Sequence, residues 1–120
     1  MTGSRIRFSV DGETLEATLG DGSAARDLLA LLPLRLTLTD FHGIEKVADL
    51  PSRLSTAGEP AGTAAKAGDI TLYAPWGNLA IFYRPFRYAD GLVRLGAFDG
   101  DITALSANDG PFEVLIEAID

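Results

Sequence analysis

Residues 73–88 combine the residue types that proteins use to hold a flat or extended ligand. This segment contains six of the ten aromatic residues of the chain, together with Arg84 and Arg87. Aromatic rings and guanidinium planes both stack on a ligand while their polar edges stay free for hydrogen bonds. The segment is therefore predicted to line a binding groove. For any single ring, however, core packing is the preferred interpretation, because apolar rings are usually buried.

The other residues with catalytic or metal-binding potential form weaker patterns. His42 is the only histidine, and without cysteine or a serine elbow motif a hydrolytic triad lacks support, so we interpret it as a solvated loop residue. All charged residues from Asp99 onward are carboxylates. Asp99-Gly100-Asp101 matches only part of a calcium loop, so a solvated acidic face is the preferred interpretation. We expect no metal and no cofactor.

Composition restricts the partners and the compartment. The 120 residues, 47% of them hydrophobic, are enough for one domain with one core. A net charge of -7 repels phosphate backbones and anionic lipids, so neither nucleic acid nor a membrane is expected as a partner. The chain has no cysteine, no apolar run long enough to span a membrane and no apolar secretory signal, which predicts a cytoplasmic protein. Composition carries no information on oligomeric state.

The N-terminal third reads as a hairpin, a helix and a strand. Period-two alternation on both sides of an Asp-Gly pair predicts a β-hairpin over residues 6–19. Ser23 is a candidate N-cap for a short helix over residues 24–32. Alternating leucines then predict a strand over residues 34–40, so we expect the helix to cover an end of the sheet.

The remainder reads as a long loop followed by strands. Proline, glycine and alanine dominate residues 50–68, which predicts an irregular surface loop. Further strands are predicted over residues 70–74, 79–84, 92–97 and 112–119. Many short strands with turns between them favour a closed antiparallel β-barrel. Alternation along the strand over residues 79–84 would place Phe82 and Arg84 on one face.

Trp76, the only tryptophan, lies in a Pro-Trp-Gly-Asn turn between two of these strands. Proline and the residues after the tryptophan favour a tight turn. We expect the indole to fold back over the barrel end, where its burial would contribute about 2 to 3 kcal/mol and Trp76→Ala would cost roughly 3 to 5 kcal/mol. The alternative is a partly exposed ring that forms a binding surface.

The sequence resembles a known family over nearly its whole length. The matching segments are residues 6–19, Leu31-Leu32-Pro33-Leu34, Glu45-Lys46-Val47, Leu50-Pro51, Gly68-Asp69-Ile70, Pro75-Trp76-Gly77, Ala80-Ile81-Phe82-Tyr83 and residues 91–96. They are similar to segments of the small bacterial and archaeal cyclophilin-like proteins, a family of uncharacterised function. The resemblance implies a mainly β fold: a cyclophilin-like closed antiparallel barrel of about eight strands with one or two short helices, as a single domain over residues 1–120.

The resemblance also bears on activity. Cyclophilin prolyl isomerases accelerate rotation about X-Pro bonds, and the resemblance places a phenylalanine of their proline pocket at Phe82. Their Phe-His-Arg-Val motif supplies an arginine that favours the twisted amide. Here Phe41-His42 is followed by Gly43. The leading hypothesis is therefore a non-catalytic or weakly catalytic binding module for a peptide or small ligand.

Two alternatives remain open. One is a peptidyl-prolyl cis-trans isomerase that takes its arginine from Arg84, Arg87 or Arg94. The other is a regulatory subunit of a metabolic enzyme, because cyclophilin-like barrels also occur inside larger amide-cleaving enzymes.

The predicted groove consists of seven residues: Phe82, Trp76, Tyr83, Arg84, Arg94, Lys46 and Glu45. Lys46 is expected to be held by a carboxylate and to anchor the loop over residues 50–68. A solvated lysine is the alternative, since surface ion pairs contribute little.

Overall fold

In the computed structural model, which describes residues 4–119, the alternating N-terminal residues form the predicted hairpin. Its strands are β1 (Arg5–Val10) and β2 (Glu13–Leu19). Asp11 and Gly12 close the turn with φ angles of 49° and 82°, the left-handed conformation that an Asp-Gly pair tolerates. The apolar residues of both strands face one interior, and the polar residues between them face solvent.

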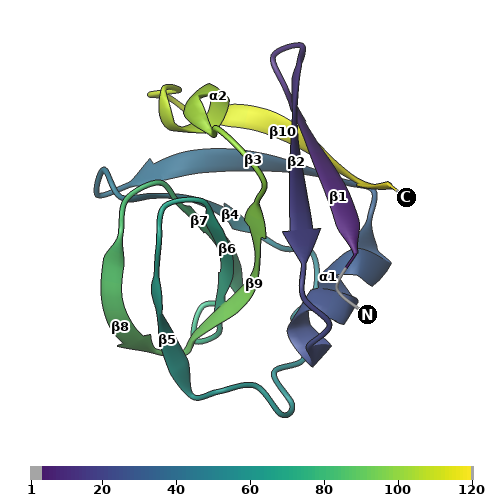
Figure 1. Cartoon of the computed structure of the whole chain (residues 1–120), viewed down its shortest axis with the longest axis vertical. Coiled ribbons are helices and arrows are strands. Elements are labelled where there is room, and N and C mark those ends of the chain that lie inside the picture. The colour runs from purple at the N-terminus through teal and green to yellow at the C-terminus, as the bar shows by residue number, and fades with distance from the viewer. Residues whose placement is uncertain (1–3, 120) are drawn as a thin grey trace.

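Six more strands close a barrel with this hairpin (Figure 1). They are β3 (Leu34–Phe41), β4 (Glu45–Asp49), β6 (Asp69–Tyr73), β7 (Asn78–Phe82), β9 (Leu92–Phe98) and β10 (Phe112–Ile119). The order around the barrel is β1-β10-β3-β4-β7-β6-β9-β2, and each pairing is antiparallel. Closure leaves no barrel strand with an unpaired edge. The predicted mainly β, closed antiparallel fold is confirmed.

Two short helices lie well apart, with α2 near the top of the view in Figure 1 and α1 at its right-hand side. Helix α1 (Ser23–Leu31) buries Ala24, Ala25 and Leu28 in the barrel core, and α2 (Thr103–Ser106) adds Leu105 to the same core. The expected N-cap is wrong, because α1 begins after Gly22 and the Ser23 hydroxyl instead donates to the carbonyl of Ala57 at 2.7 Å. Neither of the helices in residues 4–119 has the length and hydropathy of a membrane span.

A two-stranded ribbon, β5 (Gly62–Ala65) and β8 (Phe86–Asp90), lies apart from the barrel order and against its outer face. A second apolar cluster, centred on Ala80, Phe82 and Leu92, fills the space beneath it. Both ribbon strands and β4 fall in segments for which no strand was predicted. Strands of four or five residues beside proline and glycine give too short an alternation to detect.

Gly96 allows the closest approach between β9 and β2, the pairing that closes the barrel. It lies opposite Leu19, and a Cβ at this position would sit 2.2 Å from the Thr18 carbonyl oxygen and 2.8 Å from the Leu19 Cα. Both are backbone atoms of a paired strand, which cannot rotate away as a side chain can. A side chain at position 96 therefore conflicts with closure.

We expect Gly96→Ala to lower the free energy of unfolding by roughly 1 to 3 kcal/mol, the usual cost of overpacking a tight contact. Urea denaturation of the purified variant measures this. The matched control is Gly100→Ala, because a Cβ there meets no atom within 4 Å. Equal losses in the two variants would contradict the role given to Gly96.

Candidate functional site

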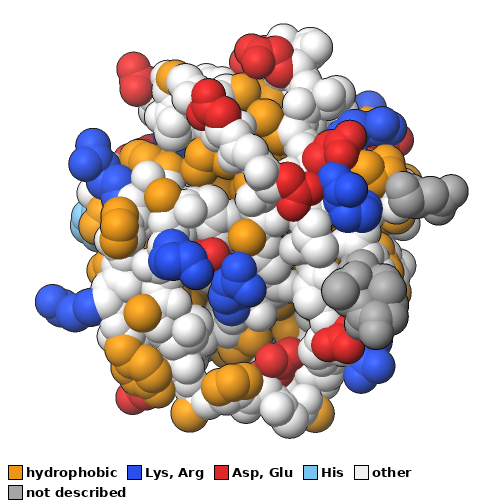
Figure 2. Space-filling model, in the orientation of Figure 1, with side chains coloured by type: hydrophobic (Ala, Val, Ile, Leu, Met, Phe, Trp, Pro, Cys, Tyr) orange, Lys and Arg blue, Asp and Glu red, His pale blue; other side chains and the backbone are white. Residues whose placement is uncertain are grey.

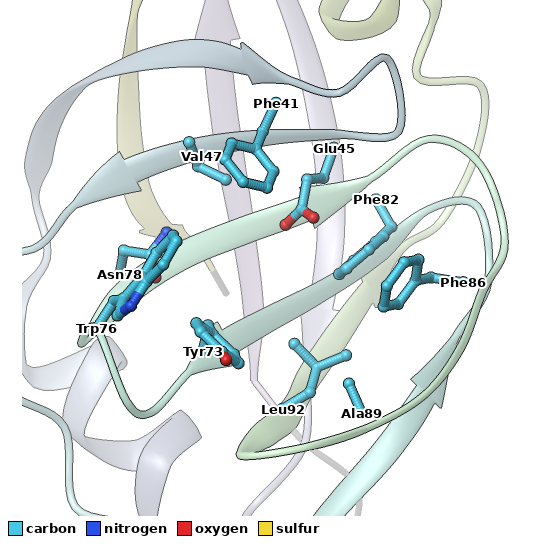
Figure 3. Close-up of a pocket in the computed structure, with 10 residues that line it drawn as sticks. All are labelled: Phe41, Glu45, Val47, Tyr73, Trp76, Asn78, Phe82, Phe86, Ala89 and Leu92. Atoms are coloured by element: carbon cyan, nitrogen blue, oxygen red, sulfur yellow. The ribbon is translucent and has the colours of Figure 1, made fainter.

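An apolar pocket of about 240 Å³ opens on the outer face of the barrel, beneath the ribbon. Figure 3 shows its ten lining residues: Phe41, Glu45, Val47, Tyr73, Trp76, Asn78, Phe82, Phe86, Ala89 and Leu92. They come from β3, β4, β6, β7, β8, β9 and the turn before β7. Strand alternation produces this lining: in β4, Lys46 and Ala48 are buried on the barrel side, while Glu45 and Val47 face the pocket.

Five aromatic rings form much of the pocket wall. The Trp76 ring meets Tyr73 edge-on at 5.3 Å between centroids and Phe41 edge-on at 6.1 Å. Phe82 and Phe86 stack at 5.7 Å. Edge-on and offset stacked pairs are the favoured geometries for such rings, so these contacts hold the wall in place.

Trp76 is 66% exposed, so the expectation that it folds back over the barrel end is wrong. The turn explains its position. The Gly77 amide donates to the Tyr73 carbonyl at 2.8 Å, and Gly77 has a φ of 67°. This tight turn leaves the indole on the outer face, at the rim of the pocket. The position agrees with the alternative prediction of a partly exposed ring.

Two polar side chains in the pocket lack partners. The Glu45 carboxyl makes no hydrogen bond or ion pair with the other residues of 4–119, and burial among apolar groups raises its pKa above the ordinary value. Asn78 is only 6% exposed, and its Oδ1 has no hydrogen-bond partner in the described chain. The pocket therefore presents unsatisfied polar groups on an apolar wall.

Lys46 points the opposite way from Glu45 and is 2% exposed. Its ammonium lies 3.2 Å from Asp40 Oδ1 and donates to the carbonyl of Asn108. It also lies 5.3 Å from the centre of the Tyr83 ring and 5.8 Å from that of Phe112. The expected carboxylate partner is confirmed. The expected anchoring of residues 50–68 is wrong, because the ammonium reaches the segment between α2 and β10.

Asp40 and Tyr83 complete this buried-lysine cluster. The Tyr83 hydroxyl donates to the same carboxylate oxygen, Oδ1 of Asp40. This bond, helped by the Gly43 amide and by Lys46, holds the pKa of Asp40 below its ordinary value against the opposing effect of burial. Desolvation, followed by the Asp40 carboxylate, raises the pKa of Tyr83 to about 12. Near pH 7 the Asp40 carboxyl is therefore ionised and the Tyr83 hydroxyl is neutral.

The structure gathers Phe82, Trp76 and Glu45 in the pocket and places the other predicted groove residues, Tyr83, Arg84, Arg94 and Lys46, outside it. Strand β7 ends at Phe82, and the amides of the next two residues both bond to the Ile44 carbonyl. The alternation that would have set Arg84 beside Phe82 therefore stops. Arg94 is bound to Asp69 at 3.2 Å.

The seven predicted groove residues omit Phe41, Val47, Ala89 and Leu92, and Asn78 and Phe86 were included only as part of the aromatic segment 73–88. Phe41 ends β3, and Asn78 begins β7, where it lies opposite Asp49 and Tyr73. A signal for either needs the order of the strands around the barrel, which the alternation pattern does not contain. Tyr73 was recognised only as part of the aromatic segment 73–88.

The weaker candidates lie away from the pocket. His42 is exposed at a φ of 57°, with its ring against Phe41. Asp101 accepts hydrogen bonds from the amide and hydroxyl of Thr103, and Asp99 pairs with Arg5 at 2.7 Å. No group of three or more potential metal-ligating side chains occurs within residues 4–119.

Comparisons with known proteins agree with this architecture. A family model described as the cyclophilin-like family matches residues 8–117. The solution structure of a hypothetical protein from Archaeoglobus fulgidus superposes with a TM-score of 0.77, at 16% sequence identity, covering 98% of this chain and 96% of that chain. At this identity the likeness shows the fold alone. None of the curated proteins matches the sequence.

We expect Lys46→Ala to lower the free energy of unfolding by about 3 kcal/mol, because it empties a buried volume and leaves the Asn108 carbonyl without its donor. Chemical denaturation at pH 7 measures the loss. Lys66→Ala is the control, because Lys66 is exposed and its ammonium forms no ion pair among the described residues. A loss for Lys46→Ala as small as that of the control would contradict the role of the buried-lysine cluster.

For Trp76→Ala we expect a loss of less than about 1 kcal/mol, as is usual for an exposed side chain. Phe8→Ala, which removes a ring with 0% exposure from the barrel core, should cost about 3 to 5 kcal/mol in the same denaturation experiment. Similar losses for the two variants would show that the indole is a core residue after all.

Proposed function

The chain belongs to the cyclophilin-like family, and on this premise we propose that it is a non-catalytic or weakly catalytic binding module whose pocket receives an apolar group of a peptide or small ligand. The observation that carries the proposal is the pocket itself, an opening of about 240 Å³ with five aromatic rings in its wall. An apolar cavity of about 150 Å³ suffices to bind benzene. The pocket therefore suits one ring or one branched side chain.

The polar groups of the pocket support binding rather than prolyl isomerisation. Rotation about an X-Pro bond is accelerated by a donor that stabilises the twisted amide nitrogen. The lining contains no arginine or lysine, and its ionisable side chains are Glu45 and Tyr73. Arg94 is occupied by Asp69 and Arg84 lies outside the pocket. No contact of the described residues favours the isomerase or the enzyme-subunit alternative.

The surface charge supports a ligand other than nucleic acid. The net charge is -7, and on the face shown in Figure 2 acidic and basic side chains are interspersed without an extended basic patch. Phosphate backbones need such a patch for their non-specific binding. A peptide or small apolar ligand fits this surface better.

The test uses blocked dipeptides of alanine followed by proline, leucine, phenylalanine or glycine, titrated while the fluorescence of Trp76 is followed. We expect saturable changes with the three apolar residues and none with glycine, because only an apolar side chain fills the pocket. The absence of any change up to millimolar dipeptide would overturn the proposal.

Phe86→Ala should weaken this binding at least tenfold, since it removes one wall of the pocket. Tyr88→Ala is its matched control, an aromatic on the same ribbon strand that is 56% exposed and does not line the pocket. Equal affinities of Phe86→Ala and Tyr88→Ala would move the binding site elsewhere.

A further inference from the structure

Glu45 and Asn78 are polar residues of the pocket whose side chains have no hydrogen-bond or ion-pair partner within residues 4–119. The Glu45 carboxyl projects from β4 toward the pocket, on the side of Phe82 and Trp76 (Figure 3). Three other carboxylates with reduced exposure or a nearby cation are ion-paired: Asp40 with Lys46, Asp69 with Arg94, and Asp99 with Arg5. No cationic side chain lines the pocket, so none forms an ion pair with Glu45 there.

The surroundings of Glu45 explain why the protein does not neutralise it internally. Its chain neighbour Lys46 is the nearest cation in sequence, but strand alternation sends that side chain to the opposite face of β4. There its ammonium is held by Asp40 and the Asn108 carbonyl. A half-buried carboxylate without a cation is disfavoured by desolvation, so a cation that enters the pocket gains a strong partner.

Asn78 adds a second, independent indication of a ligand. Asn78 is only 6% exposed and lines the pocket, yet its Oδ1 has no hydrogen-bond partner within residues 4–119. A buried amide oxygen without a donor costs about 1 to 3 kcal/mol. A half turn of the amide presents either its oxygen or its nitrogen to the pocket, so Asn78 can bond a polar group at its own end of the pocket, four residues along β7 from the strand partner of Glu45.

The aromatic wall favours the same kind of ligand. The face of an aromatic ring carries negative electrostatic potential, and indole is the strongest of the natural rings in attracting a cation. Trp76, Tyr73 and Phe41 form the end of the pocket nearest Asn78, and the first two meet at 5.3 Å. Rings and carboxylate together exclude an anion and discriminate against a neutral polar group.

We propose that the pocket binds an apolar group that carries a protonated amine, with the ammonium beside the Glu45 carboxylate and the apolar group against the aromatic rings. This inference rests on the proposed binding function and specifies its ligand class. The pocket volume of about 240 Å³ accommodates a benzyl-sized group with its amine. Alkylammonium groups of side chains or of small metabolites have this chemistry.

The test compares benzylamine, benzyl alcohol and benzoate at pH 7, where a primary amine is protonated. Binding is followed by amide chemical shifts of the isotope-labelled protein, which also locate the site. We expect benzylamine to bind at least tenfold more tightly than benzyl alcohol, and benzoate to bind most weakly. The largest shifts should come from residues of the pocket wall.

Glu45→Gln should reduce the preference for benzylamine over benzyl alcohol to less than about threefold, because the isosteric amide removes the charge and leaves the shape. Glu113→Gln is the matched control: it makes the same change in net charge at an exposed site on β10 outside the pocket. This control should keep the full preference, which separates a local contact from the general attraction of an acidic protein for cations.

The outcomes separate the two proposals. If benzyl alcohol binds in the pocket as tightly as benzylamine in the unmodified protein, the amine inference is overturned and the binding module stands. If Glu45→Gln keeps the tenfold preference, the inference is also overturned. If none of the three probes shifts the pocket residues, both proposals fail.

Discussion

Antiparallel closure of the barrel is the constraint on which the rest of the structure depends. Once β2 pairs with β9 across Gly96, each strand of the ring has one face inside and one outside. The inside is filled by the side chains of the main core, including Phe8, Leu28 and Leu105. The outer face of β4, β7 and β9 is also apolar and needs a cover, which the ribbon of β5 and β8 supplies. The pocket lies between this face and the ribbon, and Phe86 and Ala89 of β8 form part of its lining.

Much of the fold follows from local sequence patterns. Alternation, turn residues and proline predict where the first hairpin, α1, β3 and the later barrel strands lie. These signals can be recognised in the sequence because each acts over only a few residues. The ribbon strands were not predicted, since each is short and is held by partners distant in the chain, such as Thr63 opposite Ala89. Strand β4 was not predicted because Lys46 lies on its inner face and Glu45 on its outer face, so neither face is uniformly apolar. Periodicity alone predicted a closed antiparallel barrel. The family resemblance added the cyclophilin-like type of barrel and the number of strands.

The candidate site was predictable in part, for a similar physical reason. Phe82 and Trp76 belong to one conspicuous aromatic segment, and the pocket contains both. Arg84 was wrongly placed beside them in the prediction because the alternation was extended past Phe82, where hydrogen bonds to Ile44 end the strand. The exposure of Trp76 depends on the turn that Gly77 closes. The residue types of this turn are compatible with a buried or an exposed indole, so the sequence does not distinguish the two positions.

Glu45 and Lys46 show how one strand divides two adjacent opposite charges between two environments. The lysine lies inside, where a carboxylate, a backbone carbonyl and two rings compensate for its loss of water. The glutamate lies outside, where apolar burial raises its pKa and no side chain compensates. A charge left uncompensated lowers stability unless something else occupies its surroundings. The Lys46 ammonium therefore stabilises the barrel. The uncompensated Glu45 carboxylate has no such structural role, and a bound ligand would explain its presence.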